Sequence, residues 1–135
     1  PKNPGSDFVS EVDWLKLPEE AGGNDPNLDP VYVSKSLVKD LSTKSILAFR
    51  VFDDSMIDKH ICEDDIALVD ERSFARDRDC VIAIVDGEEA VLHSYHRKGG
   101  EIELRPANSD YESIVLGADK IQILAVVQGL IRTRV

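Results

Sequence analysis

The sequence predicts a mostly β domain of antiparallel strands with one short helix, and three observations predict it. A chain of 135 residues with 42% hydrophobic content suffices for one ordinary core. Short runs rich in β-branched residues recur from Ile46 onward, and turn residues separate them. We therefore expect one structural domain, in which residues 1–30 form an N-terminal strand and a linker and residues 31–135 form the main body.

The N-terminal part has the least regular pattern. Residues 8–15 alternate loosely enough for a first strand, whereas residues 18–30 contain three prolines, two glycines and several acids and are expected to form a loop. A short helix is expected at residues 34–41, because Ser34 suits an N-cap and apolar side chains follow at helical spacing.

The strands expected after the helix cover residues 46–52, 66–70, 80–85, 89–95, 101–106 and 121–131. Asp86-Gly87 and Gly99-Gly100 separate three of these runs, which predicts a meander of three strands. The last run is long and apolar, as expected of a strand buried on both faces. Its cover is either the chain's own sheet or the same strand of a second copy related by a twofold axis.

Composition limits the partners and the compartment. The formal net charge of −10 would repel a phosphate backbone, so these residues are not expected to bind DNA themselves. Cys62 and Cys80 lack disulfide or zinc-ligand spacing, which favours reduced thiols in a cytoplasmic protein. No apolar run approaches the roughly 18 residues that span a bilayer, so we expect a soluble chain with no membrane partner. The start at Pro1 suggests a fragment with a further domain upstream.

Four motifs occur in a fixed order: Asp54-Ser-Met56, Leu68-Val-Asp70, Val85-Asp-Gly-Glu88 and Leu104-Arg-Pro-Ala-Asn-Ser109. On these motifs the region from Phe49 to Ile131 resembles the C-terminal domain of LexA and phage CI-type repressors, a serine peptidase family with a signal-peptidase-like β-ribbon fold. The resemblance implies curled antiparallel sheets, homodimers formed through the C-terminal strand region, and a Ser-Lys dyad that cuts the protein's own chain. It also implies that DNA is bound only through an N-terminal helix-turn-helix domain, which these residues lack.

The resemblance places the catalytic groups at specific positions. Ser55 falls on the nucleophile, the backbone N–H groups near Ser55 and Met56 fall on the oxyanion site, and His93 falls where the family has its lysine. The nearest lysine, Lys98, lies beside the Gly99-Gly100 turn and is too far along the strand. Two interpretations of His93 stay open. Its imidazole suits a general base, or it is a partly buried polar residue without a catalytic role.

Family glycines are replaced here by Asp53, Asp64 and Arg78, although glycine suits turns with positive φ. Asp53 precedes Ser55 by two residues, and its carboxylate would oppose a developing oxyanion unless it points to solvent.

The resemblance also requires a scissile pair of small residues upstream of the serine. Ala21-Gly22 is the expected pair, and Gly22-Gly23 is a weaker second choice. The preceding Glu19 and Glu20 argue against efficient docking, because burying two unpaired carboxylates in a cleft is costly.

Three functional hypotheses follow. The first is the dimerisation and regulatory domain of a prophage-type or LexA-like transcriptional repressor with impaired self-cleavage, released by an antirepressor protein. The second is an active serine autopeptidase in which His93 is the base and Ala21-Gly22 is cut in an SOS-type response with a recombinase filament. The third is a UmuD-like polymerase accessory protein. No cofactor and no metal are expected, because the histidines and the acidic run 63–65 lack ligand spacing.

Overall fold

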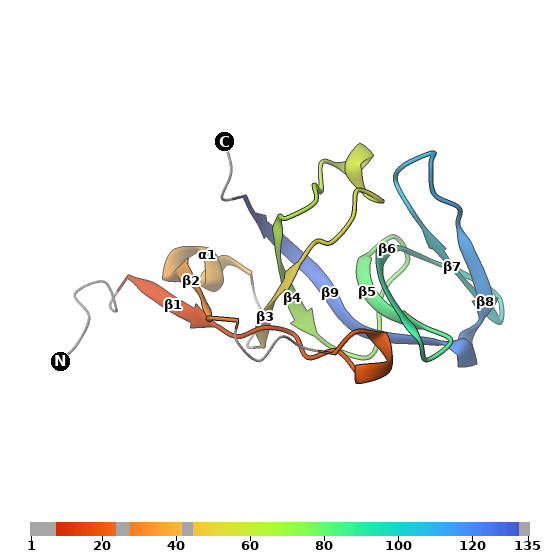
Figure 1. Ribbon diagram of the computed structural model, residues 1–135, viewed down its shortest axis with the longest axis horizontal. Coiled ribbons are helices and arrows are strands. Elements are labelled where there is room, and N and C mark those ends of the chain that lie inside the picture. Colours follow the sequence, from red (N-terminus) through yellow and green to blue (C-terminus); the bar gives the residue numbers. More distant parts are fainter. Residues whose placement is uncertain (1–7, 24–27, 42–44, 133–135) are drawn as a thin grey trace.

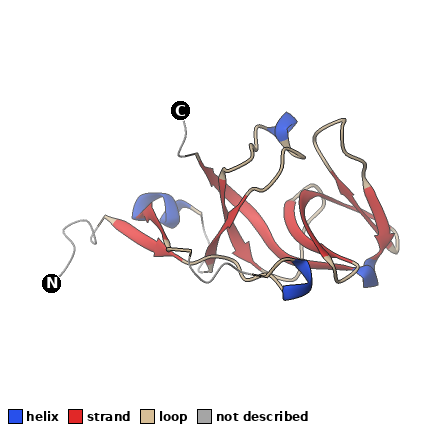
Figure 2. Cartoon of the chain, viewed as in Figure 1, coloured by secondary structure: helices blue, strands red, loops and turns tan. Residues whose placement is uncertain are grey.

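Most of the chain forms antiparallel strands, as the sequence pattern predicts. The computed structural model describes residues 8–23, 28–41 and 45–132. Its strands are β1 (Val9–Val12), β2 (Val31–Ser34), β3 (Ile46–Arg50), β4 (Ile66–Glu71), β5 (Cys80–Val85), β6 (Glu89–Lys98), β7 (Glu101–Arg105), β8 (Ile114–Gly117) and β9 (Ile121–Ile131). The helical segments are α1 (Lys35–Asp40) and three short 3-10 helices, η1 (Glu19–Ala21), η2 (Ile57–Lys59) and η3 (Ala118–Lys120). Figure 2 shows how short these helical segments are beside the strands. None of the described helices is long and apolar enough to cross a membrane.

The strands form two sheets. The larger one has the order β3-β4-β9-β5-β6-β7-β8, and the smaller one pairs β1 with β2. Figure 1 shows β1, β2 and α1 at one end of the molecule and the curled strands β5 to β8 at the other. Residues 13–15 run along the outer edge of β3, where the Leu15 N–H donates to the Ala48 carbonyl at 2.8 Å. The chain therefore covers one edge of its large sheet with its own N-terminal segment.

Strand β9 lies in the middle of the large sheet, between β4 and β5. Within the chain, both edges of β9 are paired, and its buried side chains pack into the chain's own hydrophobic clusters. Its register shifts once opposite each neighbour, beside Leu68/Val69 and beside Ile82/Ala83. Such bulges increase the local twist of a strand, which accounts for part of the curl of this sheet.

The predicted meander is present as β5, β6 and β7. Asp86 and Gly87, with φ of 53° and 75°, form the turn between β5 and β6, and two positive φ values suit the twist of a hairpin. The sequence pattern did not predict β2 and β8. Each has only four residues, which is too short for a periodic signal, and pairing with a longer neighbour decides their conformation.

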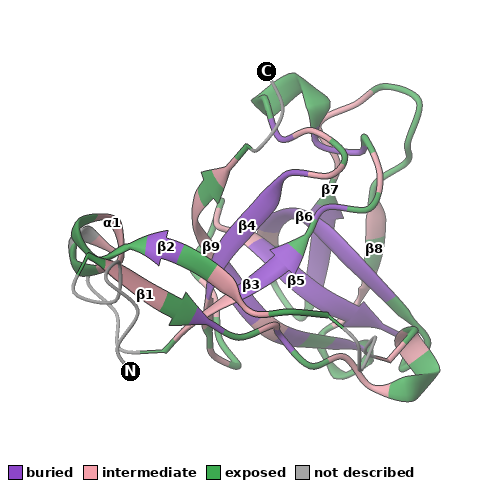
Figure 3. Ribbon diagram, turned by 60° about the vertical axis from the view of Figure 1, so that its left-hand side comes forward, coloured by how far each residue is buried: buried purple, intermediate pink, exposed green. Residues whose placement is uncertain are grey.

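The apolar side chains form buried clusters on the two sides of the large sheet. One cluster contains Phe49, Met56, Val69 and Leu92 and lies under the segment that joins β3 to β4. Another contains Val81, Tyr95, Leu104 and Ile123. Figure 3 shows that burial is concentrated on the central strands, whereas most of the connecting segments are exposed or only partly buried. The segment that carries the candidate site packs on this buried centre through Met56.

Candidate active site

Ser55 lies on the segment between β3 and β4 and is only 1% exposed. Its hydroxyl donates a hydrogen bond to Oδ1 of Asp53 at 2.7 Å, and its backbone N–H donates to the same oxygen at 3.0 Å. One carboxylate oxygen thus engages both the candidate nucleophile and one of the amides expected to stabilise an oxyanion. The side chain of Asp53 points toward Ser55 and not away from it.

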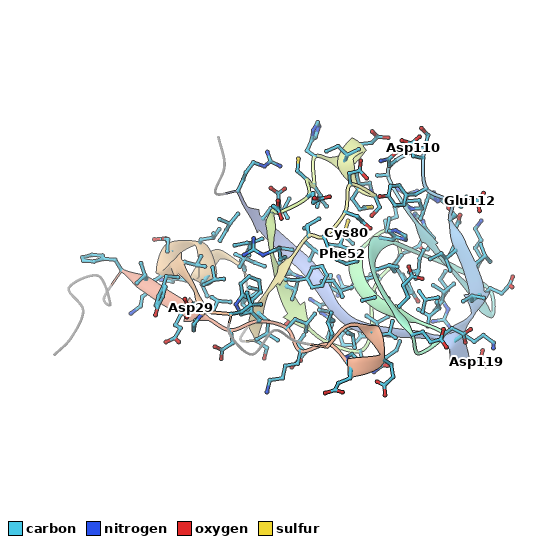
Figure 4. The ribbon with its side chains drawn as sticks, viewed as in Figure 1. Asp29, Phe52, Cys80, Asp110, Glu112 and Asp119 are labelled. Carbon is cyan, nitrogen blue, oxygen red and sulfur yellow. The ribbon has the colours of Figure 1, made fainter. Side chains whose placement is uncertain are left out.

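The loop after β7 holds this turn in place. The Ala107 N–H donates to the Ser55 carbonyl at 2.8 Å, and Asn108 Nδ2 donates to the Asp54 carbonyl at 2.9 Å. The Tyr111 hydroxyl donates to Asp54 Oδ1 at 2.7 Å, and this hydrogen bond is the main reason why the pKa of Tyr111 is raised to about 12. Figure 4 shows the side chains of the same loop, with Asp110 and Glu112 labelled. Sequence reasoning used residues 104–109 only as a motif and missed their supporting role.

Met56 is 1% exposed, and its side chain fills the core below the turn. Its carbonyl accepts hydrogen bonds from the N–H groups of Lys59 at 3.0 Å and Ile61 at 3.3 Å. These bonds close η2 directly after the serine. The Ser55 turn is consequently anchored from below by packing and on both sides by backbone hydrogen bonds.

His93 lies in β6 opposite Val81 and is 5% exposed. Burial lowers the pKa of its imidazole, while the charge of Asp53 and a hydrogen bond with the Leu104 backbone act in the opposite direction. Its Nδ1 has no hydrogen-bond partner among the residues that the structure describes. The hydroxyl proton of Ser55 is directed to Asp53 and not to this nitrogen. A lowered pKa keeps the ring neutral near pH 7, which is the form that can accept a proton.

The structure does not bring the expected scissile pair to Ser55. Ala21 lies in η1, and Gly22 follows with a φ of 108°. The Gly22 N–H donates to the Glu19 carbonyl at 3.1 Å, so the pair is held in a helical turn. This turn lies against β6, and Figure 1 shows η1 (orange) and η2 (yellow-green) at opposite edges of the molecule.

Two of the three positions with replaced family glycines have left-handed backbone. Asp64 has a φ of 72° and Arg78 a φ of 75°, and His60 also has a positive φ of 63°. Aspartate tolerates this region better than arginine does. Asp53 does not have a positive φ, so it acts on the site through its carboxylate and not through backbone strain.

A second aspartate, Asp65, closes the same segment before β4. Its side chain accepts the Cys62 N–H at 2.8 Å and both Nε and Nη2 of Arg132 at 2.9 Å. The hydrogen bond with Arg132 is the main reason why the pKa of Asp65 is lowered, although burial opposes it. This pair ties the chain beyond β9 to the segment that carries Ser55. Within the described residues, no group of three or more His, Cys, Asp or Glu side chains could hold a metal ion.

Comparisons with known proteins agree with this architecture. Residues 18–128 match the family described as Peptidase S24-like. The LexA repressor of Thermotoga petrophila is 41% identical over 83 residues, which cover 62% of this chain and 42% of the relative. The LexA repressor of Syntrophobacter fumaroxidans is 41% identical over 92 residues, which cover 68% of this chain and 44% of the relative.

The LexA repressor of Erythrobacter litoralis is 40% identical over 85 residues, which cover 63% of this chain and 36% of the relative. The chain thus spans less than half the length of these curated relatives. The match to the family covers most of the chain, together with both flanks of Ser55 and the strand that carries His93. On this evidence the chain belongs to the peptidase S24-like family and is related to LexA repressors.

Proposed function

We propose that this chain is the C-terminal dimerisation and regulatory domain of a phage-type or LexA-like transcriptional repressor, and that its self-cleavage is impaired. The family and the repressors among its relatives support the first part. The second part rests on one observation, the two hydrogen bonds from Ser55 to Oδ1 of Asp53. DNA binding belongs to an upstream helix-turn-helix domain in this proposal.

The position of Asp53 impedes each requirement of a nucleophilic serine. A serine attacks efficiently only when a base takes its proton, and here the hydroxyl is held by a carboxylate. An oxyanion needs free N–H donors, and the Ser55 amide already donates to Asp53. A negative charge at this point also repels the negative charge of the tetrahedral intermediate. These three effects act in the same direction.

A second candidate is an active autopeptidase in which His93 replaces the lysine and Ala21-Gly22 is cut. The observation in its favour is that His93 is buried, has a lowered pKa and leaves Nδ1 unpaired among the described residues. In that case the Ser55 hydroxyl must leave Asp53 before it reaches the imidazole. The turn at Ala21 must also leave β6 and extend toward the serine.

Incubation of the purified chain at alkaline pH, and separately with an activated recombinase filament, distinguishes the two candidates. We expect the intact mass to stay unchanged, as in the matched Ser55→Ala variant. Fragments that end at Ala21 and that the Ser55→Ala variant lacks would establish the autopeptidase and contradict impaired cleavage.

The proposed dimer is tested separately from self-cleavage. We place its interface at the C-terminal end of β9, where residues 128–131 are less buried than the first part of the strand and Leu130 is 36% exposed. Light scattering over a dilution series should report a dimer that dissociates only on dilution. A monomeric mass at high concentration would count against the repressor assignment.

A repressor that is not cut needs another release mechanism, for which we propose an antirepressor protein bound to this domain.

A further inference from the structure

The large sheet has one covered edge and one open edge. Residues 13–15 cover β3, whereas β8 is the last strand on the other side and, in the part of the chain that the structure describes, pairs with β7 alone. Figure 1 shows β8 at the end of the molecule opposite to β1 and α1. Val115 in this strand is 46% exposed. An edge strand presents unpaired N–H and C=O groups, to which another strand can add.

The register shows which backbone groups of β8 point outward. The Ala118 N–H donates to the Gly100 carbonyl at 3.2 Å, and hydrogen-bonded pairs alternate with non-bonded pairs along an antiparallel ladder. Counted back from this pair, Val115 and Gly117 stand in non-bonded pairs with β7. The Val115 N–H and C=O and the Gly117 N–H therefore face away from β7. The Gly117 carbonyl is used differently, because Gly117 is the N-cap of η3.

Two free carboxylates stand beside this edge. Glu112 precedes β8 and Asp119 follows it, and Figure 4 shows the two labelled side chains at the two ends of the strand. A Cβ added at Gly117 would lie 2.7 Å from Oδ1 of Asp119, so this carboxylate is close to the strand itself. Neither carboxylate forms an ion pair with a residue in the described ranges.

The cations of the neighbouring elements do not balance these carboxylates. Five charged side chains form ion pairs among themselves, namely Lys98 and Arg105 with Glu103, and Lys120 with Asp86. These pairs leave one positive charge in excess. Three exposed carboxylates, Glu101, Glu112 and Asp119, outnumber it, and Arg97 lies on β6, beyond β7. The surroundings of the open edge are therefore negative.

We propose that the open edge of β8 binds an extended segment of a partner protein that carries a lysine or arginine near each end. The segment adds to the sheet as a further strand, so that backbone hydrogen bonds give affinity and the two carboxylates select basic residues. A second copy of this chain fits less well. Antiparallel pairing of β8 with its own copy would bring Glu112 of one copy near Asp119 of the other, and like charges on paired strands repel. The proposal does not use Ser55 and does not depend on the proposed function.

An NMR titration tests the proposal with a synthetic peptide, acetyl-Lys-Thr-Val-Thr-Val-Thr-Lys-amide. We expect saturable ¹⁵N-¹H shifts of the Val115 and Gly117 amides and slower hydrogen exchange of both, because these amides then donate to the peptide. The same peptide with glutamate in place of both lysines should bind at least about tenfold more weakly, because like charges would meet. A peptide methylated on the amides that face β8 should not bind.

Two variants of the chain separate the backbone contribution from the charge contribution. Val115→Pro removes an outward N–H and should abolish binding. The strand should be retained in this variant, because an edge strand tolerates proline where its N–H faces solvent. Glu112→Gln with Asp119→Asn keeps the backbone edge and should weaken binding by about fivefold, as expected for the loss of two exposed ion pairs.

The matched control removes two charges at the other end of the molecule. Glu11→Gln with Asp29→Asn neutralises two exposed carboxylates far from β8, where Figure 4 labels Asp29. This variant should bind the peptide as the unchanged chain does. An equal loss in the control, binding that survives Val115→Pro, or absence of saturation would overturn the proposal. Protection of the Val115 and Gly117 amides that rises with the concentration of the chain alone would also overturn it, since the edge would then pair with a second copy.

Discussion

Asp53 and Asp65 lie near the two ends of the segment that joins β3 to β4, and their carboxylates have different partners. Each carboxylate accepts a backbone N–H of a turn, from Ser55 at 3.0 Å and from Cys62 at 2.8 Å. Asp65 also binds the Arg132 guanidinium with both oxygens. Asp53 has no ion pair with any described residue, and its other hydrogen bond comes from the Ser55 hydroxyl.

This difference in partners separates a structural carboxylate from one that affects chemistry. The charge of Asp65 is compensated by Arg132, so its main effect is on the stability of the segment. The charge of Asp53 is not compensated by a cation. It therefore acts on the neighbouring groups, the Ser55 hydroxyl and the His93 imidazole.

The largest expected effect comes from removing Asp53 and supplying the family's base. The double variant Asp53→Gly, His93→Lys frees the Ser55 hydroxyl and amide and places a buried amine near the serine. We expect self-cleavage at alkaline pH to rise by at least about a hundredfold, the usual contribution of general-base catalysis and of an oxyanion donor. Intact mass against time measures it.

The control for this prediction adds Ser55→Ala to the double variant, which should remove all cleavage. The corresponding change at the other carboxylate, Asp65→Asn with His93→Lys, should not increase cleavage beyond that of His93→Lys alone. Equal gains in self-cleavage from the two aspartate changes would contradict the different roles assigned to Asp53 and Asp65.

The second prediction concerns the free energy of unfolding, for which Asp65 is expected to matter more than Asp53. Asp65→Ala leaves the Cys62 N–H and the Arg132 guanidinium without their shared partner at a site where Asp65 is 2% exposed. We expect a loss of about 2 kcal/mol in the free energy of unfolding, as for a buried hydrogen bond to a charged group. Asp53→Ala should lose less, because it leaves the Ser55 hydroxyl and N–H without their partner but leaves no guanidinium unpaired. Urea unfolding of the two variants gives both values, and an equal loss would contradict the comparison.

Sequence reasoning predicted much of the fold but less of the site. Strands with apolar alternation and glycine turns, such as β5 to β7, were predicted because their pattern is local. The position of Ser55 was also predicted, because the motif around it is a contiguous run. The direction of the Asp53 side chain was left open between the serine and solvent, since a rotamer depends on surrounding atoms and not on spacing.

Contacts between distant segments could not be predicted from the pattern. Tyr111 reaches Asp54 across 57 positions, and Arg132 reaches Asp65 across 67 positions. Lys59 and Arg105 are a further example, since they belong to different elements but line one cavity. Such contacts depend on the register and twist of strands, which periodicity alone does not fix.

The smallest expected effect is a change in the pH dependence of stability, which comes from the titration of His93. The pKa of His93 is lowered in the folded chain, so the unfolded chain takes up a proton at a higher pH than the folded chain does. Stability from this group is therefore complete above the unfolded pKa of about 6.5 and is lost as the pH falls below it. The His93→Gln variant should lose less stability between neutral and mildly acidic pH than the unchanged chain. His60→Asn, at an exposed position that asparagine tolerates with positive φ, is the control and should not change this dependence.

The same titration compares the two aspartates directly. The charge of Asp53 raises the pKa of His93 against the effect of burial, whereas Asp65 is not among the groups that affect it. Asp53→Asn should lower the pKa of His93 further and steepen the loss of stability in acid, and Asp65→Asn should leave this pKa unchanged. NMR titration of the His93 ring protons measures the pKa itself, independently of unfolding. If both variants shift it equally, the two carboxylates act at long range alike. If only Asp53→Asn shifts it, the uncompensated carboxylate beside Ser55 is the one that sets the protonation of the candidate base.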